Sequence, residues 1–200
     1  MGQTLDSLLA PKRQGRLFIL SGPAGSGKNT LVSRLREESA LIDESVSYTT
    51  RPPRPNEENE RDYHFVTRID FERRVSEGVF LEHVLLYGHY YGTSKVEVEQ
   101  RLARGHHVFL VIDTQGALKL KGQIPATLIF VAPPSIDELK IRLLKRKTET
   151  HDSIERRLAW AKNEMKKWRE YDYLIENDDV DQAYEILKSV VIAEAHRCQS

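Results

Sequence analysis

A chain of 200 residues is long enough for one α/β domain with a substantial core, and its 30 basic and 30 acidic side chains cancel. Zero net charge argues against a strongly electrostatic nucleic-acid binder. A single cysteine, Cys198, excludes an internal disulfide, and the apolar runs are too short to span a bilayer. The N-terminal residues lack a signal-peptide core, so we expect a cytoplasmic protein without nucleic-acid or membrane partners.

The first half of the chain predicts a strand, a glycine-rich loop and several helices. "RLFIL" at residues 16–20 is a short apolar run that predicts a buried strand, and a helix follows the loop. Residues 51–62 are rich in proline and charge and are predicted to be irregular and exposed. "FERRVSEGVF" and "SKVEVEQRLARG" predict helices that end at Gly78 and Gly105.

Strands and helices continue to alternate in the second half. "HHVFLVID", "ATLIFVAPP" and "YDYLIEN" predict strands, and "SIDELKIRLLKRK" predicts a helix with Ser135 as its N-cap. Residues 180–196 predict the last helix. One amphipathic helix is expected over residues 151–169, because apolar side chains recur there at intervals of three or four, at Ile154, Leu158, Ala161, Met165 and Trp168. This alternation predicts an α/β fold with a parallel sheet flanked by helices.

"SGPAGSGKNT" at residues 21–30 nearly fits the phosphate-binding pattern G-x-x-x-x-G-K-[ST]. Gly22, Gly27 and Lys28 fit it, whereas Asn29 stands where the pattern has a hydroxyl. Backbone N–H groups of such a loop surround phosphate oxygens, and the lysine contacts the transferable phosphate. Glycine-rich turns also occur without a ligand, but a strand before this loop and a helix after it favour phosphate binding.

Asp113 ends the apolar run "VFLVID". An acid at the end of a buried strand can hold a magnesium-bound water in a phosphate-loop enzyme. Taken alone, an aspartate in this position is more often a turn or cap residue. The sequence leaves both interpretations open.

Three further stretches carry a family resemblance. "SVSYTTRPPRPNEENERDYHFV", "GVFLEHVLLYGHYYGTS" and "IENDD" resemble the guanylate kinase family in their order and spacing, from about Arg16 to the last helix. The resemblance implies transfer of the γ-phosphoryl group of ATP to GMP, with Mg²⁺ accompanying ATP, by a monomer or homodimer. It also implies a P-loop NTPase core at about 16–47, 96–139 and 168–200, an inserted monophosphate-binding lobe at about 48–95, a helical lid at about 140–167 and an N-terminal extension at 1–15.

The resemblance assigns the phosphate loop to ATP. The implied ATP-binding residues are Gly22, Pro23, Ala24, Gly25, Ser26, Gly27, Lys28, Asn29 and Thr30, with Asn177 near the adenine. Asn29 and Asp113 are the candidate metal ligands. Lys28 and three arginines would neutralise the moving phosphoryl group, namely Arg142, Arg146 and Arg157. Without the resemblance, these arginines would be read as the polar faces of two basic helices.

A second group of residues would bind GMP. Two arginine forks and phenol donors suit a dianionic phosphate, and a carboxylate with hydroxyls suits guanine. The implied set is Ser47, Arg51, Arg54, Tyr63, Glu82, Tyr91, Thr93 and Asp113. Taken alone, Arg51 and Arg54 would belong to a solvated proline-rich loop, and Glu82 would be an exposed acid.

The sequence departs from the family pattern at three positions. Asn29 replaces the loop hydroxyl, Val111 stands where many members carry a second acid, and His83 replaces an aromatic residue. An amide carbonyl can ligate a hard cation. "GKNT" is also similar to the "GKGT" of adenylate kinases, which place no side chain there. We therefore expect Asn29 to weaken metal binding without abolishing the reaction.

Two other functions compete with a GMP kinase. Guanylate-kinase-like domains of scaffold proteins bind protein ligands, and related P-loop kinases act on other phosphorylated acceptors. The intact loop, Asp113 and the arginines argue against a binding module. Glu82 together with "TTRPPR" argues against another acceptor.

Overall fold

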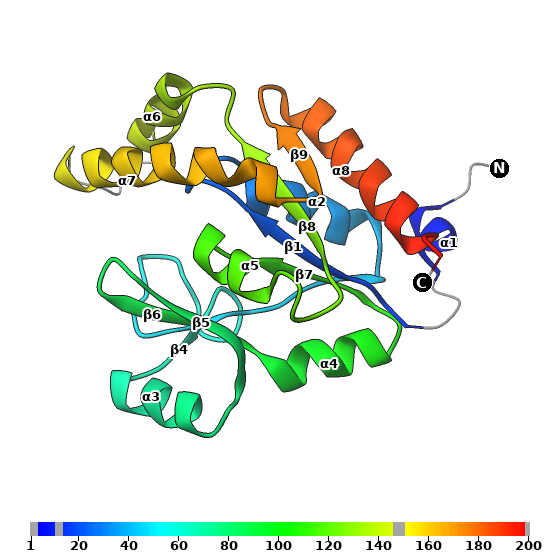
Figure 1. Cartoon of the computed structure of the whole chain (residues 1–200), viewed down its shortest axis with the longest axis horizontal. Helices are drawn as coiled ribbons and strands as arrows, with labels where there is room; N and C mark the ends of the chain where they lie inside the picture. Colours follow the sequence, from blue (N-terminus) through cyan, green and yellow to red (C-terminus); the bar gives the residue numbers. More distant parts are fainter. Residues whose placement is uncertain (1–3, 11–13, 146–150, 199–200) are drawn as a thin grey trace.

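The computed structural model describes residues 4–10, 14–145 and 151–198. Its centre is a five-stranded parallel sheet with the order β2-β7-β1-β8-β9, as Figure 1 shows. The strands are β1 (Leu17–Ser21), β2 (Ile42–Glu44), β7 (His107–Val111), β8 (Thr127–Ala132) and β9 (Tyr173–Glu176). Every residue of β1 and β8 is buried, as expected for central strands that are covered on both faces.

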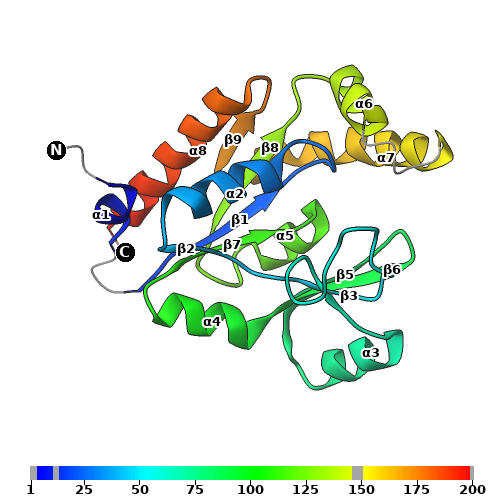
Figure 2. The same cartoon turned by 180° about the vertical axis from the view of Figure 1, so that it is seen from behind.

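Helices cover both faces of this sheet (Figure 2). On one face, α2 (Lys28–Glu38) and α8 (Val180–Ala195) bury apolar side chains against β1 and β8. On the other face, α4 (Lys95–Ala103) and α5 (Thr114–Leu120) complete a second apolar cluster. The predicted α/β fold with a helix-flanked parallel sheet is confirmed.

The N-terminal segment also belongs to the core. A short helix, α1 (Leu5–Leu9), begins at Thr4, whose side chain accepts a hydrogen bond from the Ser7 amide. Leu5 and Leu9 are buried in the cluster that α8 closes, and the Leu9 carbonyl lies 2.9 Å from Nε2 of His107. This helix therefore packs on the domain rather than extending away from it.

A small lobe, residues 48–94, follows β2. Its sheet has the order β4-β3-β6-β5. The elements are β3 (Tyr48–Thr49), β4 (His64–Phe65), α3 (Arg68–Ser76), β5 (Phe80–Leu86) and β6 (His89–Ser94). Phe71 of α3 stacks on Phe80 and Tyr90, with ring centroids 4.6 and 5.2 Å apart, which fastens the helix to the sheet. Residues 51–62 connect β3 to β4 irregularly and are mostly exposed, as predicted.

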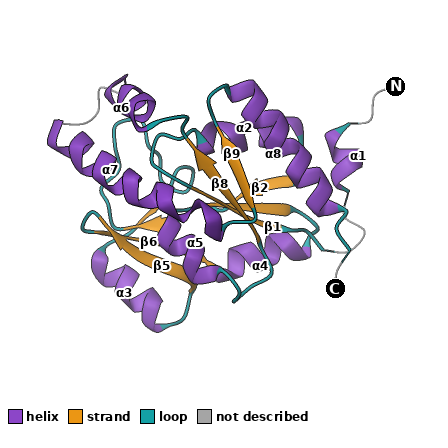
Figure 3. Cartoon of the chain, turned by 45° about the horizontal axis from the view of Figure 1, so that its top comes forward, coloured by secondary structure: helices purple, strands orange, loops and turns teal. Residues whose placement is uncertain are grey.

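A helical arm, α6 and α7, connects β8 to β9. It contains α6 (Ile136–Lys145) and α7 (His151–Glu164), which pack through Leu139, Leu143 and Leu158, and a 3₁₀ helix, η1 (Met165–Glu170), follows. The predicted Ser135 cap is confirmed, since its Oγ accepts a hydrogen bond from the Glu138 amide at 3.0 Å. Figure 3 shows α7 running from α6 back toward α5.

The expectation of one amphipathic α-helix through residue 169 is wrong at its C-terminal end. The α-helix stops at Glu164, and Trp168 is 40% exposed instead of buried. The 3₁₀ helix has three residues per turn, so the apolar face predicted from α-helical spacing does not continue through it. Across the described stretches of the chain, no helix has both the length and the apolarity needed to cross a membrane.

Candidate active site

The phosphate-loop pattern forms a tight turn between β1 and the amino end of α2. Gly22, Gly25 and Gly27 have φ values of 135°, 98° and 97°, which glycine adopts without strain. A Cβ on Gly22 would lie 2.2 Å from the Val131 carbonyl oxygen, so no side chain fits there. The partial positive charge of the α2 amino terminus favours an anion next to this turn.

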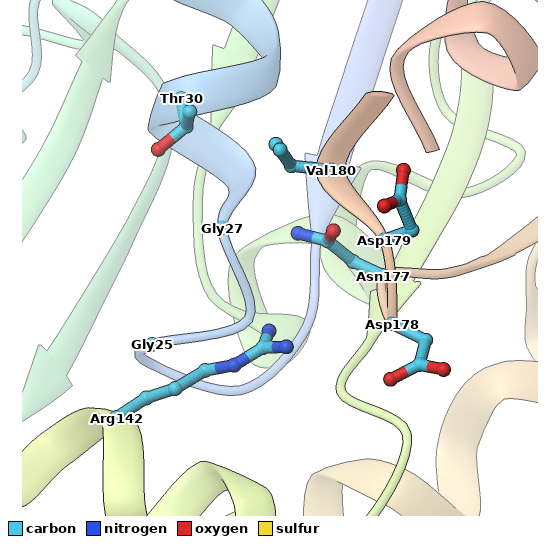
Figure 4. Close-up of a pocket in the computed structure, with 8 residues that line it drawn as sticks. All are labelled: Gly25, Gly27, Thr30, Arg142, Asn177, Asp178, Asp179 and Val180. Carbon is cyan, nitrogen blue, oxygen red and sulfur yellow. The ribbon is translucent and has the colours of Figure 1, made fainter. Parts of the chain in front are cut away.

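Asn177 holds the loop from the opposite side. Its Nδ2 donates to the Ser26 carbonyl at 2.7 Å, and the side chain is buried after β9. A Cβ on Gly27 would approach that nitrogen to 2.1 Å, which explains the glycine. Figure 4 shows the amide between the loop and the start of α8.

A cavity of about 470 Å³ lies beside this contact. Its lining is Gly25, Gly27, Thr30, Arg142, Asn177, Asp178, Asp179 and Val180. Arg142 extends from α6 toward the loop, as Figure 4 shows, and its Nε donates to Oε1 of Glu138 at 3.1 Å. The structure thus places one predicted arginine and Asn177 next to the phosphate loop. Arg146 lies outside the described residues.

A larger cavity of about 630 Å³ connects the loop, the small lobe and the helical arm. Most of the residues predicted for the site line it, namely Gly22, Ala24, Gly25, Gly27, Lys28, Asn29, Thr30, Ser47, Arg51, Arg54, Tyr63, Glu82, Tyr91, Asp113 and Arg157. Of the remaining predictions, Pro23 and Ser26 lie within the loop, and Thr93 reaches the cavity through Glu82. Nζ of Lys28 donates to the carbonyls of Gly22 at 2.7 Å and Pro23 at 2.9 Å.

Arg51 and Arg54 share a partner that the sequence analysis missed. Glu57 accepts a bidentate pair from Arg51 at 2.9 and 3.0 Å, and the Arg54 amide at 2.7 Å. The Arg51 guanidinium also lies 5.3 Å from the ring centroid of Tyr63, which packs edge-on against Tyr91. Although burial acts to raise it, the pKa of Glu57 is lowered by the hydrogen bonds from Arg51 and Arg54. Its place in the "TTRPPRPNE" block was the available signal.

Glu82 is a buried acid that lines the larger cavity. The β5–β6 register places it opposite Thr93, whose hydroxyl donates to Oε1 at 2.7 Å. Within the described part of the chain, Oε2 has no hydrogen-bond partner. Burial, with a smaller contribution from the charge of Asp113, raises the pKa of Glu82 to about 7 despite the Thr93 hydrogen bond. A Cβ on Gly116 would lie 2.7 Å from Oε2, so this glycine makes room for the carboxylate.

Asp113 is both a helix cap and a cavity residue. Strand β7 ends at Val111, and the Asp113 carboxylate accepts the amides of Gln115 at 3.1 Å and Gly116 at 3.0 Å, which begins α5. It also lines the larger cavity with Asn29 and Val111. The two interpretations left open by the sequence are therefore compatible.

The oxygen donors on this cavity wall suit a hard cation but do not enclose one. Asn29 is exposed beside the loop, and Asp113 offers a carboxylate to the same cavity. Among the residues that the structure describes, no group of three or more His, Cys, Asp or Glu side chains could hold a metal ion. An ion bound here would complete its coordination with phosphate oxygens and water, as Mg²⁺ does in phosphoryl-transfer sites.

Glu164 is a second acid that the sequence analysis missed. It ends α7, is 5% exposed and lines the larger cavity. Burial raises its pKa, while the positive charge of Lys28 and hydrogen bonds from Thr114 oppose the shift. Its position three residues after buried Ala161 was the signal, because an acid at that spacing points to the buried face of the helix.

Comparisons with known proteins find similarity along nearly the whole chain. The guanylate kinase family model matches residues 14–194. Guanylate kinase of Protochlamydia amoebophila (strain UWE25) is 52% identical over 185 residues, covering 92% of this chain and 94% of the relative. That of Chlamydia pneumoniae is 44% identical over 197 residues, covering 96% of both chains. The crystal structure of guanylate kinase from Anaplasma phagocytophilum has a TM-score of 0.78 at 33% identity, covering 94% of this chain and 89% of that one. The chain belongs to the guanylate kinase family.

Proposed function

We propose that this protein transfers the γ-phosphoryl group of ATP to GMP, giving ADP and GDP. The observation that carries the proposal is the buried carboxylate of Glu82 in the cavity that also contains the phosphate loop. An ionised carboxylate is acceptor-only, and guanine offers two donors, N1–H and the 2-amino group. Adenine presents an acceptor at N1 and no group at position 2, so it would leave the buried charge unpaired.

Residues of the small lobe are evidence that the acceptor carries a phosphate. Arg51 and Arg54 lie at the cavity wall with the phenols of Tyr63 and Tyr91. Guanidinium groups bind phosphate through charge-assisted hydrogen bonds, and the phenols add donors. Such a set suits the dianionic phosphate of a nucleoside monophosphate. Ser47 lines the same cavity and would contribute a hydroxyl to the base.

The phosphate loop and the smaller cavity support ATP as the donor. The two cavities share Gly25, Gly27 and Thr30, so a nucleotide whose phosphates follow the loop could place its base beside Asn177. Asn29 and Asp113 would hold Mg²⁺ together with the phosphates. Bound there, the ion would withdraw charge from the phosphate oxygens.

The proposed mechanism consists of positioning and charge neutralisation. An ionised GMP phosphate oxygen forms a bond to the γ-phosphorus as the bond to the bridging oxygen breaks, so no strong general base is needed. Lys28 would act from the loop, and Arg142 and Arg157 from the helical arm, which would serve as the lid that the family resemblance implies. Arg146 retains the role implied by the family resemblance.

A coupled assay with ATP and each of GMP, AMP, CMP and UMP tests the proposal. Wild type should prefer GMP over AMP by about ten-thousandfold in kcat/KM, because a site built on such hydrogen bonds rejects bases that leave them unmade. Glu82→Gln should lower that ratio more than about tenfold, since the amide replaces one acceptor with a donor. Glu72→Gln is the matched control, because Glu72 is an exposed small-lobe acid that pairs with Arg68.

Three outcomes would contradict the proposal. A ratio within about threefold of wild type in Glu82→Gln, worth less than about 1 kcal/mol, would mean that the base is read elsewhere. Turnover of no monophosphate would favour a binding module. Preference for a different phosphorylated acceptor would favour another P-loop kinase.

A further inference from the structure

The tip of the β5–β6 hairpin contacts the helical arm. The ring centroids of Tyr87 and Trp160 lie 6.0 Å apart at an interplanar angle of 59°. The Arg157 guanidinium lies 5.8 Å from the centroid of the Tyr87 ring. Arg157 and Trp160 are three residues apart on α7, so they share one helix face, and all three side chains line the larger cavity.

The backbone at this tip is unfavourable for a tyrosine. Leu86 pairs with His89, so Tyr87 and Gly88 form a two-residue connection with φ values of 50° and 84°. Positive φ at both positions favours Asn-Gly or Asp-Gly, and a bulky side chain there is an outlier. The Tyr87 side chain is 53% exposed, so burial within the small lobe does not account for it. Contact with the helical arm accounts for an aromatic ring at this position, whereas the turn geometry does not.

We propose that Tyr87 is a positioning residue that docks the small lobe against the helical arm and orients Arg157 toward the phosphoryl group. The inference rests on the proposed function, in which Arg157 neutralises charge during transfer. An aromatic face attracts a guanidinium without placing a negative charge beside it, so Arg157 keeps its positive charge for the phosphoryl group. Because Tyr87 belongs to the small lobe and Arg157 to the arm, the contact fixes the placement of Arg157 relative to the small lobe.

Tyr87→Asn separates this role from the stability of the hairpin. Asparagine tolerates positive φ, so the turn should be at least as stable, while the ring is lost. Leu85→Asn is the matched control, because Leu85 lies on the same hairpin and alternates to the face opposite Val84 and Leu86, which line the cavity. Tyr87→Asn should reduce kcat about tenfold with less than about threefold change in the KM for GMP. Tyr87→Phe should retain wild-type kcat, because it keeps the ring.

A double-mutant cycle tests whether Tyr87 acts through Arg157. If it does, Tyr87→Asn should reduce kcat little further once Arg157→Ala is present, because the interaction is already lost. Additive losses would overturn the proposal, as would an unchanged kcat in Tyr87→Asn. A loss of kcat accompanied by a lower unfolding midpoint than that of Leu85→Asn would point to a structural role and would also overturn it.

Tryptophan fluorescence reports the contact without turnover. The chain has two tryptophans, so Trp168→Phe leaves Trp160 as the single reporter. In this background, Tyr87→Asn should change Trp160 emission before any nucleotide is added, and Leu85→Asn should not. Unchanged emission in an enzyme active on GMP would overturn the Tyr87 proposal alone. A wild-type protein inactive on GMP would overturn the proposed function and, with it, the role of Tyr87.

Discussion

Protonation of Glu82 should make GMP binding depend on pH near neutrality. Burial raises the pKa of this carboxyl to about 7, and the charge of Asp113 adds to the shift. The ionised form offers acceptors to both guanine donors, whereas the protonated form presents a hydroxyl donor. The affinity for GMP should therefore fall as the pH falls through 7.

The size of the effect follows from the ionised fraction. A group with a pKa of about 7 is about nine-tenths ionised at pH 8 and about one-tenth ionised at pH 6. If the carboxylate is the form that binds guanine, the Kd for GMP rises about tenfold between these values, or about 1.4 kcal/mol.

Titration calorimetry at pH 6, 7 and 8 measures this change. A phosphate monoester itself titrates near pH 6, so the wild-type profile alone is ambiguous. Glu82→Gln keeps Arg51 and Arg54, and its profile reports the phosphate without the Glu82 carboxyl. Parallel profiles of the two proteins, or tighter wild-type binding at pH 6, would refute the reasoning.

The same group affects the free energy of unfolding in the opposite direction. The folded pKa of about 7 exceeds the ordinary value of 4.5, so Glu82 contributes most to stability below pH 4.5, and this is lost as the pH rises to 7. A shift of that size corresponds to about 3 kcal/mol. Relative to wild type, Glu82→Gln should therefore gain stability between pH 5 and 8 in denaturant unfolding. An equal pH dependence in the two proteins would contradict the raised pKa.

Three further substitutions test other parts of the site. Lys28→Ala should lower turnover at least about a hundredfold in the coupled assay, because it removes the positive charge that neutralises the transferring phosphate. Unchanged turnover would exclude Lys28 from the mechanism. Arg142→Ala should lower kcat more than it raises the KM for GMP, whereas exposed Lys162→Ala should change neither; equal effects would make Arg142 an ordinary surface cation. Glu57→Ala should raise the Kd for GMP about tenfold by releasing Arg51, and calorimetry showing equal or tighter binding would refute this positioning role.

Local patterns allowed much of the fold to be predicted. Buried strands, helices closed by Gly78 and Gly105, and the Ser135 cap depend on neighbouring residues, so spacing alone indicates them. The end of α7 could not be predicted in this way. The 3₁₀ helix that begins at Met165 leads into β9, and just before that strand the Asp172 amide donates to the Leu128 carbonyl at 2.9 Å, a contact between residues far apart in the sequence.

The candidate site likewise has parts that local sequence patterns predict and parts that depend on contacts between distant residues. The phosphate loop is contiguous and could be predicted, whereas the contact of Asn177 with Ser26 joins residues 151 positions apart. Spacing would have left Glu82 exposed, and the family resemblance alone indicated a role in the site. Its burial depends on pairing with Thr93 and on the missing side chain of Gly116, two features that no local pattern contains.

The position of Val111 next to these acids suggests a physical effect of the valine on the ionisation of Glu82. It is half-buried on the cavity wall with Glu82 and Asp113, at the position where the family resemblance implies a second acid. Like charges raise the pKa of a neighbouring carboxyl, and Asp113 already does so for Glu82. A further acid would push Glu82 toward its neutral form, in which it no longer accepts from both guanine donors. Valine avoids that repulsion and adds no oxygen to the proposed Mg²⁺ ligands Asp113 and Asn29. In the proposed function, the valine that favours an ionised Glu82 therefore also reduces the protein's own contribution to metal binding.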